Sequence, residues 1–252
     1  MRVKELLLWF FAFTNLFVSI SEAQFFLASE TISPNEVKSS SKYSLLDEFD
    51  PGHYKSLVKM YNVPQEQELV IKMKRKVLDI TNYMERARFS REQVFVNGDA
   101  IGENVAMFTV SSRGFLPGEK CEIIVESQSG KSRSEPIVLT PLPVISKSKN
   151  SEASISAELA LLYPTTYSIS FEGFDPDEKL KITTISYDEK GSGELVFSKK
   201  NGFLFTPGVI GKEGGISKIT IYRQNGEQIS QYLPWGKDLI PYSKGEVKPL
   251  GS

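Results

Sequence analysis

Beyond Pro64, hydrophobic and polar residues alternate along most of the chain. Leu69, Ile71 and Met73 show the pattern first, and short runs rich in branched residues repeat it as far as Leu233. A period of two places alternate side chains on opposite faces of a β-strand. Many short strands with few helices indicate antiparallel β-sandwiches, so the predicted fold class is mainly β. We predict strands at 69–73, 94–96, 105–110, 121–125, 137–139, 166–171, 180–186, 194–197, 203–206, 216–222 and 228–233.

Turn and linker residues divide these strands into two groups. Residues 141–153 are rich in proline and then polar, as a linker is expected to be. We therefore predict two antiparallel immunoglobulin-like β-sandwich units, at 65–143 and 144–236, preceded by a short helical segment. Asn-Gly pairs, which favour tight hairpin turns, occur at 97–98, 201–202 and 225–226.

One stretch of the chain occurs twice. Residues 108–140 align without a gap on residues 167–199, and ten of the 33 positions are identical. The repeat lies late in the first unit and early in the second, which argues against a simple duplication of whole domains. The identical pairs are Ser111/Ser170, Gly114/Gly173, Phe115/Phe174, Pro117/Pro176, Glu119/Glu178, Lys120/Lys179, Ile123/Ile182, Ser127/Ser186, Lys131/Lys190 and Glu135/Glu194.

A tight turn lies at the centre of each copy. In residues 116–119, Pro117 occupies the second turn position and Gly118 the third, which predicts a type II turn. In the second copy the third position is Asp177, which predicts a type I turn. Phe115 and Phe174 are expected to pack over the sandwich ends. The shared phrase G-F-x-P-x-E-K resembles the immunoglobulin-like and fibronectin-like repeats of exported bacterial proteins. That resemblance implies a spacer, an adhesive module or an accessory part of an assembly, and no functional residue is carried over from it.

The segments that flank the two units have weaker patterns. Asp50 and Pro51 suit a helix start, and apolar residues then recur every three or four positions as far as Tyr61. We predict a helix over 44–61, within a mobile arm at 24–64. Residues 237–252 are polar and carry proline and glycine, so they are predicted to form a flexible tail.

The first 23 residues have the pattern of a secretory signal peptide. Arg2 and Lys4 precede an apolar run at 6–18, and a small-x-small site predicts cleavage between Ala23 and Gln24. The run is shorter than the roughly 20 apolar residues of a membrane span, and nothing downstream is apolar enough to span. The mature chain is therefore expected in the periplasm, at the cell surface or in the medium.

Composition narrows the class of protein. Lys and Arg number 30 against 31 Asp and Glu, without a basic stripe, so nucleic acid is not an expected partner. The single Cys excludes an internal disulfide, and no Asn begins an N-x-Ser/Thr site. Both observations favour a bacterial source over an animal extracellular one.

The residues that perform most enzyme chemistry are scarce. Cys121 aligns with Leu180 and therefore reads as a buried apolar position rather than as a nucleophile. His53, the only histidine, is expected at an exposed helix start, so a metal site built from His or Cys is excluded. No Gly-x-Ser-x-Gly elbow occurs. A Ser-Lys dyad stays open but has no sequence signal, and no cofactor or catalytic residue is predicted.

Two loops invite functional interpretations that simpler ones outweigh. Asp175, Asp177 and Glu178 could suit Ca²⁺ or a glycosidase pair, but turn chemistry explains them more directly. The glycine-rich residues 208–215 lack the phosphate-loop spacing, because Thr206 stands where a glycine is required. We expect a flexible connection there that could act in recognition.

Aromatic residues near the end of the second unit are the candidate contact surface. Tyr222, Tyr232 and Trp235 could stack on a sugar or contact a protein, although for Trp235 packing at the end of the sandwich is the favoured interpretation. We expect a non-enzymatic binding or structural module of the bacterial cell envelope, with an unidentified protein or glycan partner. A carbohydrate-binding or carbohydrate-active accessory domain is one alternative. A partner-dependent assembly subunit that uses the arm and the tail is the other.

Overall fold

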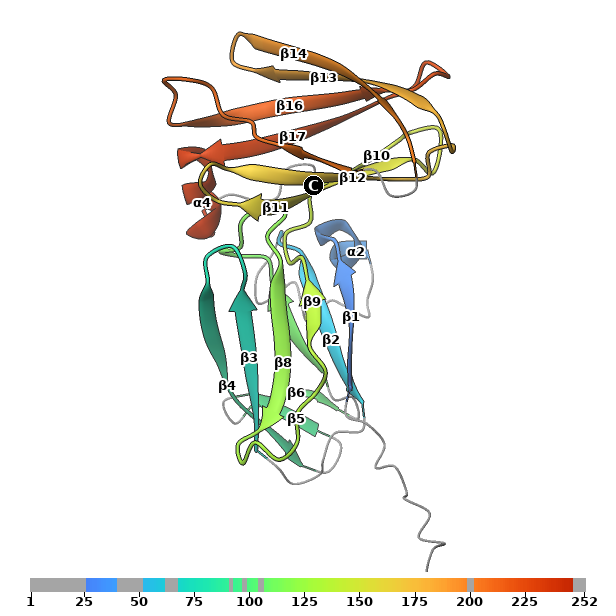
Figure 1. Ribbon diagram of the computed structural model, residues 1–252. Helices are drawn as coiled ribbons and strands as arrows, with labels where there is room; N and C mark the ends of the chain where they lie inside the picture. Colours follow the sequence, from blue (N-terminus) through green and yellow to red (C-terminus); the bar gives the residue numbers. More distant parts are fainter. Residues whose placement is uncertain are drawn as a thin grey trace, which may run out of the picture.

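Two β-sandwich units form the chain in a computed structural model (Figure 1). The structure describes residues 26–39, 52–61, 68–90, 93–96, 99–103, 107–198 and 202–246. Strands of the second unit run across those of the first, so the first unit abuts the flank of the second (Figure 1). All four sheets are antiparallel, which confirms the predicted mainly β class with two sandwich units.

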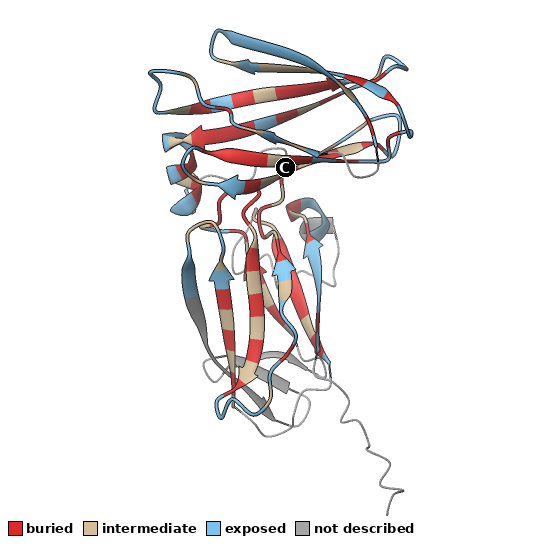
Figure 2. Ribbon diagram, viewed as in Figure 1, coloured by how far each residue is buried: buried red, intermediate tan, exposed pale blue. Residues whose placement is uncertain are grey.

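Two sheets make up the first unit. Its strands are β1 (Phe26–Ile32), β2 (Lys55–Tyr61), β3 (Glu68–Arg75), β4 (Ile80–Ser90), β5 (Gln93–Val96), β6 (Asp99–Glu103), β7 (Met107–Ser111), β8 (Cys121–Ser127) and β9 (Ile137–Leu139). One sheet has the order β1-β2-β7 and the other β6-β5-β4-β3-β8-β9. Alternate residues of β8 are buried, as the two-residue period requires (Figure 2).

The second unit also has two sheets. Its strands are β10 (Ile145–Lys147), β11 (Ser154–Leu161), β12 (Thr166–Glu172), β13 (Lys179–Ser186), β14 (Glu189–Val196), β15 (Gly202–Phe205), β16 (Gly214–Tyr222) and β17 (Gln228–Gly236). The sheet orders are β10-β11-β12-β15 and β14-β13-β16-β17. The β13–β14 hairpin lies along the top margin of the molecule and is largely exposed (Figure 2).

The predicted turns have different outcomes. At 225–226 the Gly226 N–H donates to the Arg223 carbonyl at 3.1 Å, which confirms the hairpin between β16 and β17. The hairpin predicted at 201–202 is wrong, because β14 and β15 belong to different sheets. Residues 97–98 lie outside the described residues. The predicted linker at 141–153 contains β10, and β11 follows it directly.

The helix predicted over 44–61 is wrong where the structure describes it. Residues 40–51 lie outside the described residues, and Lys55–Tyr61 forms β2, paired with β1 on one side and β7 on the other. A central strand can be covered on both faces, so Leu57 and Val58 are both buried and mimic a helical spacing. The one helix described in the predicted arm is α2 (Pro34–Ser39), which follows β1. β1 and β2 therefore belong to the first sandwich rather than to a separate arm.

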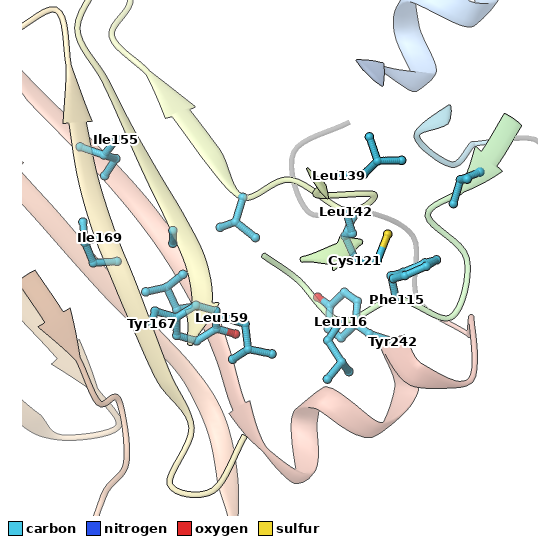
Figure 3. Close-up of a cluster of buried hydrophobic side chains, with 14 of the residues drawn as sticks. Phe115, Leu116, Cys121, Leu139, Leu142, Ile155, Leu159, Tyr167, Ile169 and Tyr242 are labelled. Carbon is cyan, nitrogen blue, oxygen red and sulfur yellow. The ribbon is translucent and has the colours of Figure 1, made fainter. Parts of the chain in front are cut away.

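The predicted tail begins with ordered structure. A 3₁₀ turn, η2 (Lys237–Leu239), leads into the short helix α4 (Ile240–Ser243). Leu239 and Tyr242 are buried and belong to the same hydrophobic cluster as the sandwich cores. Figure 3 shows this cluster crossing from one unit to the other, with Leu142 and Leu116 on one side and Leu159 and Tyr167 on the other. The two units therefore share a continuous core.

Candidate functional site

The repeated motif forms the same corner in each unit. In the first copy, the Glu119 side chain is fully buried where β7 passes into β8. Arg75 Nε donates to Glu119 Oε1 at 2.8 Å, and the Leu116 N–H donates to Oε2 at 2.9 Å. The Arg75 guanidinium also lies over the Phe115 ring, 4.7 Å from its centroid. A buried carboxylate is thus neutralised by an arginine that an aromatic ring holds in place.

The second copy repeats these contacts where β12 passes into β13. Arg223 Nε and Nη2 each donate to Glu178 at 2.9 Å, and the guanidinium lies 4.9 Å from the Phe174 ring centroid. Hydrogen bonds from Arg223 hold the pKa of Glu178 below its ordinary value, and the same pairing raises the pKa of Arg223. Phe115 and Phe174 are both buried, as predicted for ends of the sandwiches.

Both corners contain a type II turn. Gly118 has φ +74° and the Glu119 N–H donates to the Leu116 carbonyl at 3.0 Å, as predicted. The type I prediction for the second copy is wrong, because Asp177 has φ +63°. Aspartate tolerates the left-handed region better than most residues, and the exposed position leaves its side chain free to adopt it.

The two corners occupy different places in the chain order of their units. Arg75 lies 44 residues before Glu119, whereas Arg223 lies 45 residues after Glu178. Arg75 is the last residue of β3, which pairs with β8, and Arg223 directly follows β16, which pairs with β13. In each unit the corner therefore lies where the chain crosses from one sheet to the other, between β7 and β8 and between β12 and β13.

Acidic residues of the second corner are committed to Arg223. Both Glu178 oxygens accept hydrogen bonds from it, and an Asp175 carboxylate oxygen lies 3.5 Å from its Nη2. This geometry uses the carboxylates to balance one buried cation, rather than converging them on a metal or a glycosidic bond. No cluster of three metal-ligating side chains occurs among the described residues.

The first corner also joins the two units. Gly118 lies so close to β11 that an added Cβ would be 2.5 Å from the Ala157 carbonyl oxygen. The Leu159 N–H donates to the Gly118 carbonyl at 2.9 Å, and the Gly118 N–H donates to the Leu142 carbonyl at 2.8 Å. A surface ion pair, Lys120 to Glu158 at 2.6 Å, flanks these bonds. Backbone contact with no intervening side chain holds the units at a fixed angle.

This joint forms one end of a groove of about 810 Å³. A volume of this size is typical of ligand-binding sites. The outer edges of β10 and β17 border it, and Ser146 Oγ donates to Gln231 Oε1 at 2.6 Å across it. We call it the junction groove; its lining residues are Tyr54, Pro117, Leu142, Pro143, Val144, Ile145, Ser146, Lys147, Lys149, Asn150, Gly226, Glu227, Gln228, Ile229, Ser230, Gln231, Tyr232, Pro234 and Tyr242.

The groove wall combines neutral phenols with a fixed ionic cluster. Burial raises the pKa of Tyr54 and of Tyr242, so both phenols are neutral at physiological pH. Glu227 is largely covered, and hydrogen bonds from Ser148, then Ser151 and Arg223, lower its pKa to about 2. It is therefore ionised and already satisfied by its neighbours. A ligand in the groove would meet a strand edge, amide side chains, aromatic rings and the side chains of Lys147 and Lys149.

The three predicted contact residues do not form one surface. Tyr232 is half exposed and lines the junction groove, with Lys218 Nζ 5.8 Å from its ring centroid. Tyr222 lies on the same outward face of the sheet but pairs with Gln228, four positions along β17 from Tyr232. Trp235 is only 4% exposed and packs edge-on against Tyr187, 6.4 Å between ring centroids. Of the three predicted residues, only Tyr232 lines the groove, and no sequence pattern indicated the other lining residues.

The other candidate residues do not line the junction groove. Cys121 is fully buried, as is its counterpart Leu180, and burial raises the pKa of the thiol to about 12. His53 lies in a turn before β2 and is half-buried, so the predicted exposed helix start is wrong. In the glycine-rich segment, Gly214 already belongs to β16, and the exposed turn is limited to residues 209–212. Within the described residues, no helix is long and apolar enough to cross a membrane.

Comparison with known proteins adds little to this geometry. No family model matches the chain, and no curated protein matches it. Among solved structures, the chain is similar to a segment of two fibronectin type-III domains from chicken tenascin, at 13% identity and a TM-score of 0.24. The match covers 73% of this chain and 94% of that one. The fold assignment rests on the sheet orders described above.

Proposed function

We propose that this chain is an exported, non-enzymatic binding module of a bacterial cell envelope that holds an extended protein segment in the junction groove. The observation that carries the proposal is the joint itself. Gly118 meets the backbone of β11 directly, so both units contribute walls to a groove whose shape is fixed. A pre-formed groove lowers the entropy cost of binding.

Export is proposed on the N-terminal pattern. Residues 1–25 lie outside the described residues, so the support is the charged start, the apolar run and the site before Gln24. N-terminal sequencing of the protein from its native cell is expected to begin at Gln24. A chain that begins at Met1 and fractionates with membranes would contradict export.

A protein segment fits the groove better than a glycan does. Trp235 is buried, so the side chain best suited to sugar stacking is not offered to a ligand. Tyr232 has Lys218 beside one face of its ring. What the groove does offer is the outer edge of β10, which carries an exposed apolar side chain, Ile145, at 53% exposure. Such a surface suits backbone pairing and apolar anchoring.

Matched tyrosine variants test the groove. The purified protein is used to capture partners from an envelope extract, with Tyr232→Ala and Tyr222→Ala compared at equal loading. Because only Tyr232 lines the groove, we expect Tyr232→Ala to lose the captured protein and Tyr222→Ala to retain it. Equal capture by both variants, or binding to a glycan array that Tyr232→Ala abolishes, would replace the protein-segment proposal. Circular dichroism confirms that both variants stay folded.

A further inference from the structure

No strand among the described residues pairs with the outer edge of β14. β14 has eight residues, pairs only with β13 and lies at the top margin of the molecule (Figure 1). Because Ser186 and Glu189 pair across a two-residue turn, the backbone groups of Lys190, Ser192 and Glu194 point away from β13. An exposed row of this kind is a template for pairing with another strand.

The opposite edge of the same sheet is blocked. On β17, Gln231 Nε2 donates to the Tyr232 carbonyl at 3.2 Å, and the Tyr167 hydroxyl donates to the Pro234 carbonyl at 2.7 Å. Pro234 also lacks an N–H, so it cannot donate to an added strand. Within the described residues, no side chain is hydrogen-bonded to the outward backbone groups of Lys190, Ser192 and Glu194 in this way. The difference between the two edges of one sheet points to a role for the open one.

We propose that two copies of this chain form a dimer through antiparallel pairing of β14 with β14, centred on Ser192. In this register Lys190 of each copy lies opposite Glu194 of the other, on the outward face. Neither side chain has an ion-pair partner among the described residues. The sequence about Ser192 is thus self-complementary in charge, which is what a two-fold symmetric contact requires.

Inward-facing residues of β14 are compatible with this pairing. Gly191 and Gly193 lie opposite each other across the proposed contact and present no side chain that would obstruct it. Beneath this edge is a groove of about 400 Å³ with an apolar floor that includes Ile182, Leu195 and Phe203. An open edge above apolar surface is an aggregation hazard unless it is paired. Dimerisation joins the β14-β13-β16-β17 sheet of one copy to the same sheet of the other copy, which gives one continuous sheet.

Charge reversal with rescue tests the register. Sedimentation velocity of the purified protein is expected to show a dimer that dissociates on dilution. Lys190→Glu alone and Glu194→Lys alone each place like charges opposite one another and should yield monomer. The double variant Lys190→Glu/Glu194→Lys restores both cross-strand pairs and should recover the dimer. A monomeric wild-type protein at high concentration, or a dimer unaffected by both single variants, would overturn the proposal.

A cysteine at the symmetry centre provides a second measurement. Residues directly opposite in an antiparallel pair have Cα atoms roughly 4.5–5.5 Å apart, within the range that a disulfide spans. Ser192→Cys is therefore expected to give a covalent dimer under mild oxidation, whereas Ser230→Cys, on the blocked edge of the same sheet, is not. The buried Cys121 does not compete. Equal cross-linking at both positions would indicate random collision and refute the β14 contact.

Discussion

Gly118→Ala tests whether direct backbone contact holds the two units together. The new Cβ would lie 2.5 Å from the Ala157 carbonyl oxygen and 3.0 Å from the Leu159 nitrogen. An ordinary van der Waals contact between a carbon and an oxygen is about 1 Å longer than the distance to the Ala157 oxygen. The corner must therefore move away from β11. Gly130→Ala is the matched control, because Gly130 has a similar φ of +71° but no atom within 4 Å of the added Cβ.

The structure gives the size of the expected effect. An alanine in the left-handed region costs about 1–2 kcal/mol, and both variants carry that cost. Only Gly118→Ala also disturbs the hydrogen bonds with Leu159 and Leu142, each worth about 1 kcal/mol. We expect a loss of about 3–4 kcal/mol for Gly118→Ala against about 1–2 kcal/mol for Gly130→Ala. That difference is a large part of the roughly 5–15 kcal/mol stability of a typical domain.

Two measurements separate strain from loss of the joint. Urea unfolding followed by Trp235 fluorescence and by circular dichroism gives the free energy of unfolding of each variant. Proteinase K digestion reports whether residues 140–144, between the units, become accessible. We expect early cleavage there in Gly118→Ala and wild-type protection in Gly130→Ala. Equal losses of stability in the two variants, with residues 140–144 protected in both, would refute the close-contact reasoning.

Two further predictions concern buried groups. Cys121→Leu should cost under about 1.5 kcal/mol because its counterpart is already leucine, whereas Cys121→Asp should unfold the first unit by burying an unpaired charge. Thiol reagents should label native Cys121 slowly, since burial raises its pKa to about 12; rapid labelling would contradict the core assignment. The folded-state pKa values of Glu178 and Glu227 lie below the ordinary 4.5, so their stabilisation is complete above that pH and is lost as pH falls through the folded-state values, that of Glu227 being about 2. Melting temperatures of wild type should fall across that window, and those of Glu227→Gln should fall less; parallel curves would exclude the Glu227 contribution.

The sequence predicted those strands whose two faces differ. β8 and β16 alternate clearly because one face meets the core and the other meets solvent or a partly covered surface. The residue spacing in β2 predicts a helix because both faces of this strand are buried at its centre. β11 carried a usable signal, since Ile155, Ala157 and Leu159 alternate and are buried, but a small alanine weakened it.

The candidate site was much less accessible to sequence reasoning. The G-F-x-P-x-E-K phrase identified two turns, but the arginines that complete them lie more than 40 residues away and in opposite directions along the chain. No local pattern encodes a partner set by strand register. The junction groove depends on the angle between the units, which a few backbone contacts at Gly118 determine.

The two corners also differ in what they present outwards. Leu116 is buried at the joint, whereas its counterpart Asp175 has a side chain that is 86% exposed. Another unit stacked on the second corner as the second stacks on the first would have to bury the aspartates at 175 and 177 in place of leucine and glycine. One motif therefore provides a connector in one copy and a terminus in the other. The two aspartates therefore oppose the stacking of a further unit on the second corner, because their charged side chains would have to leave water.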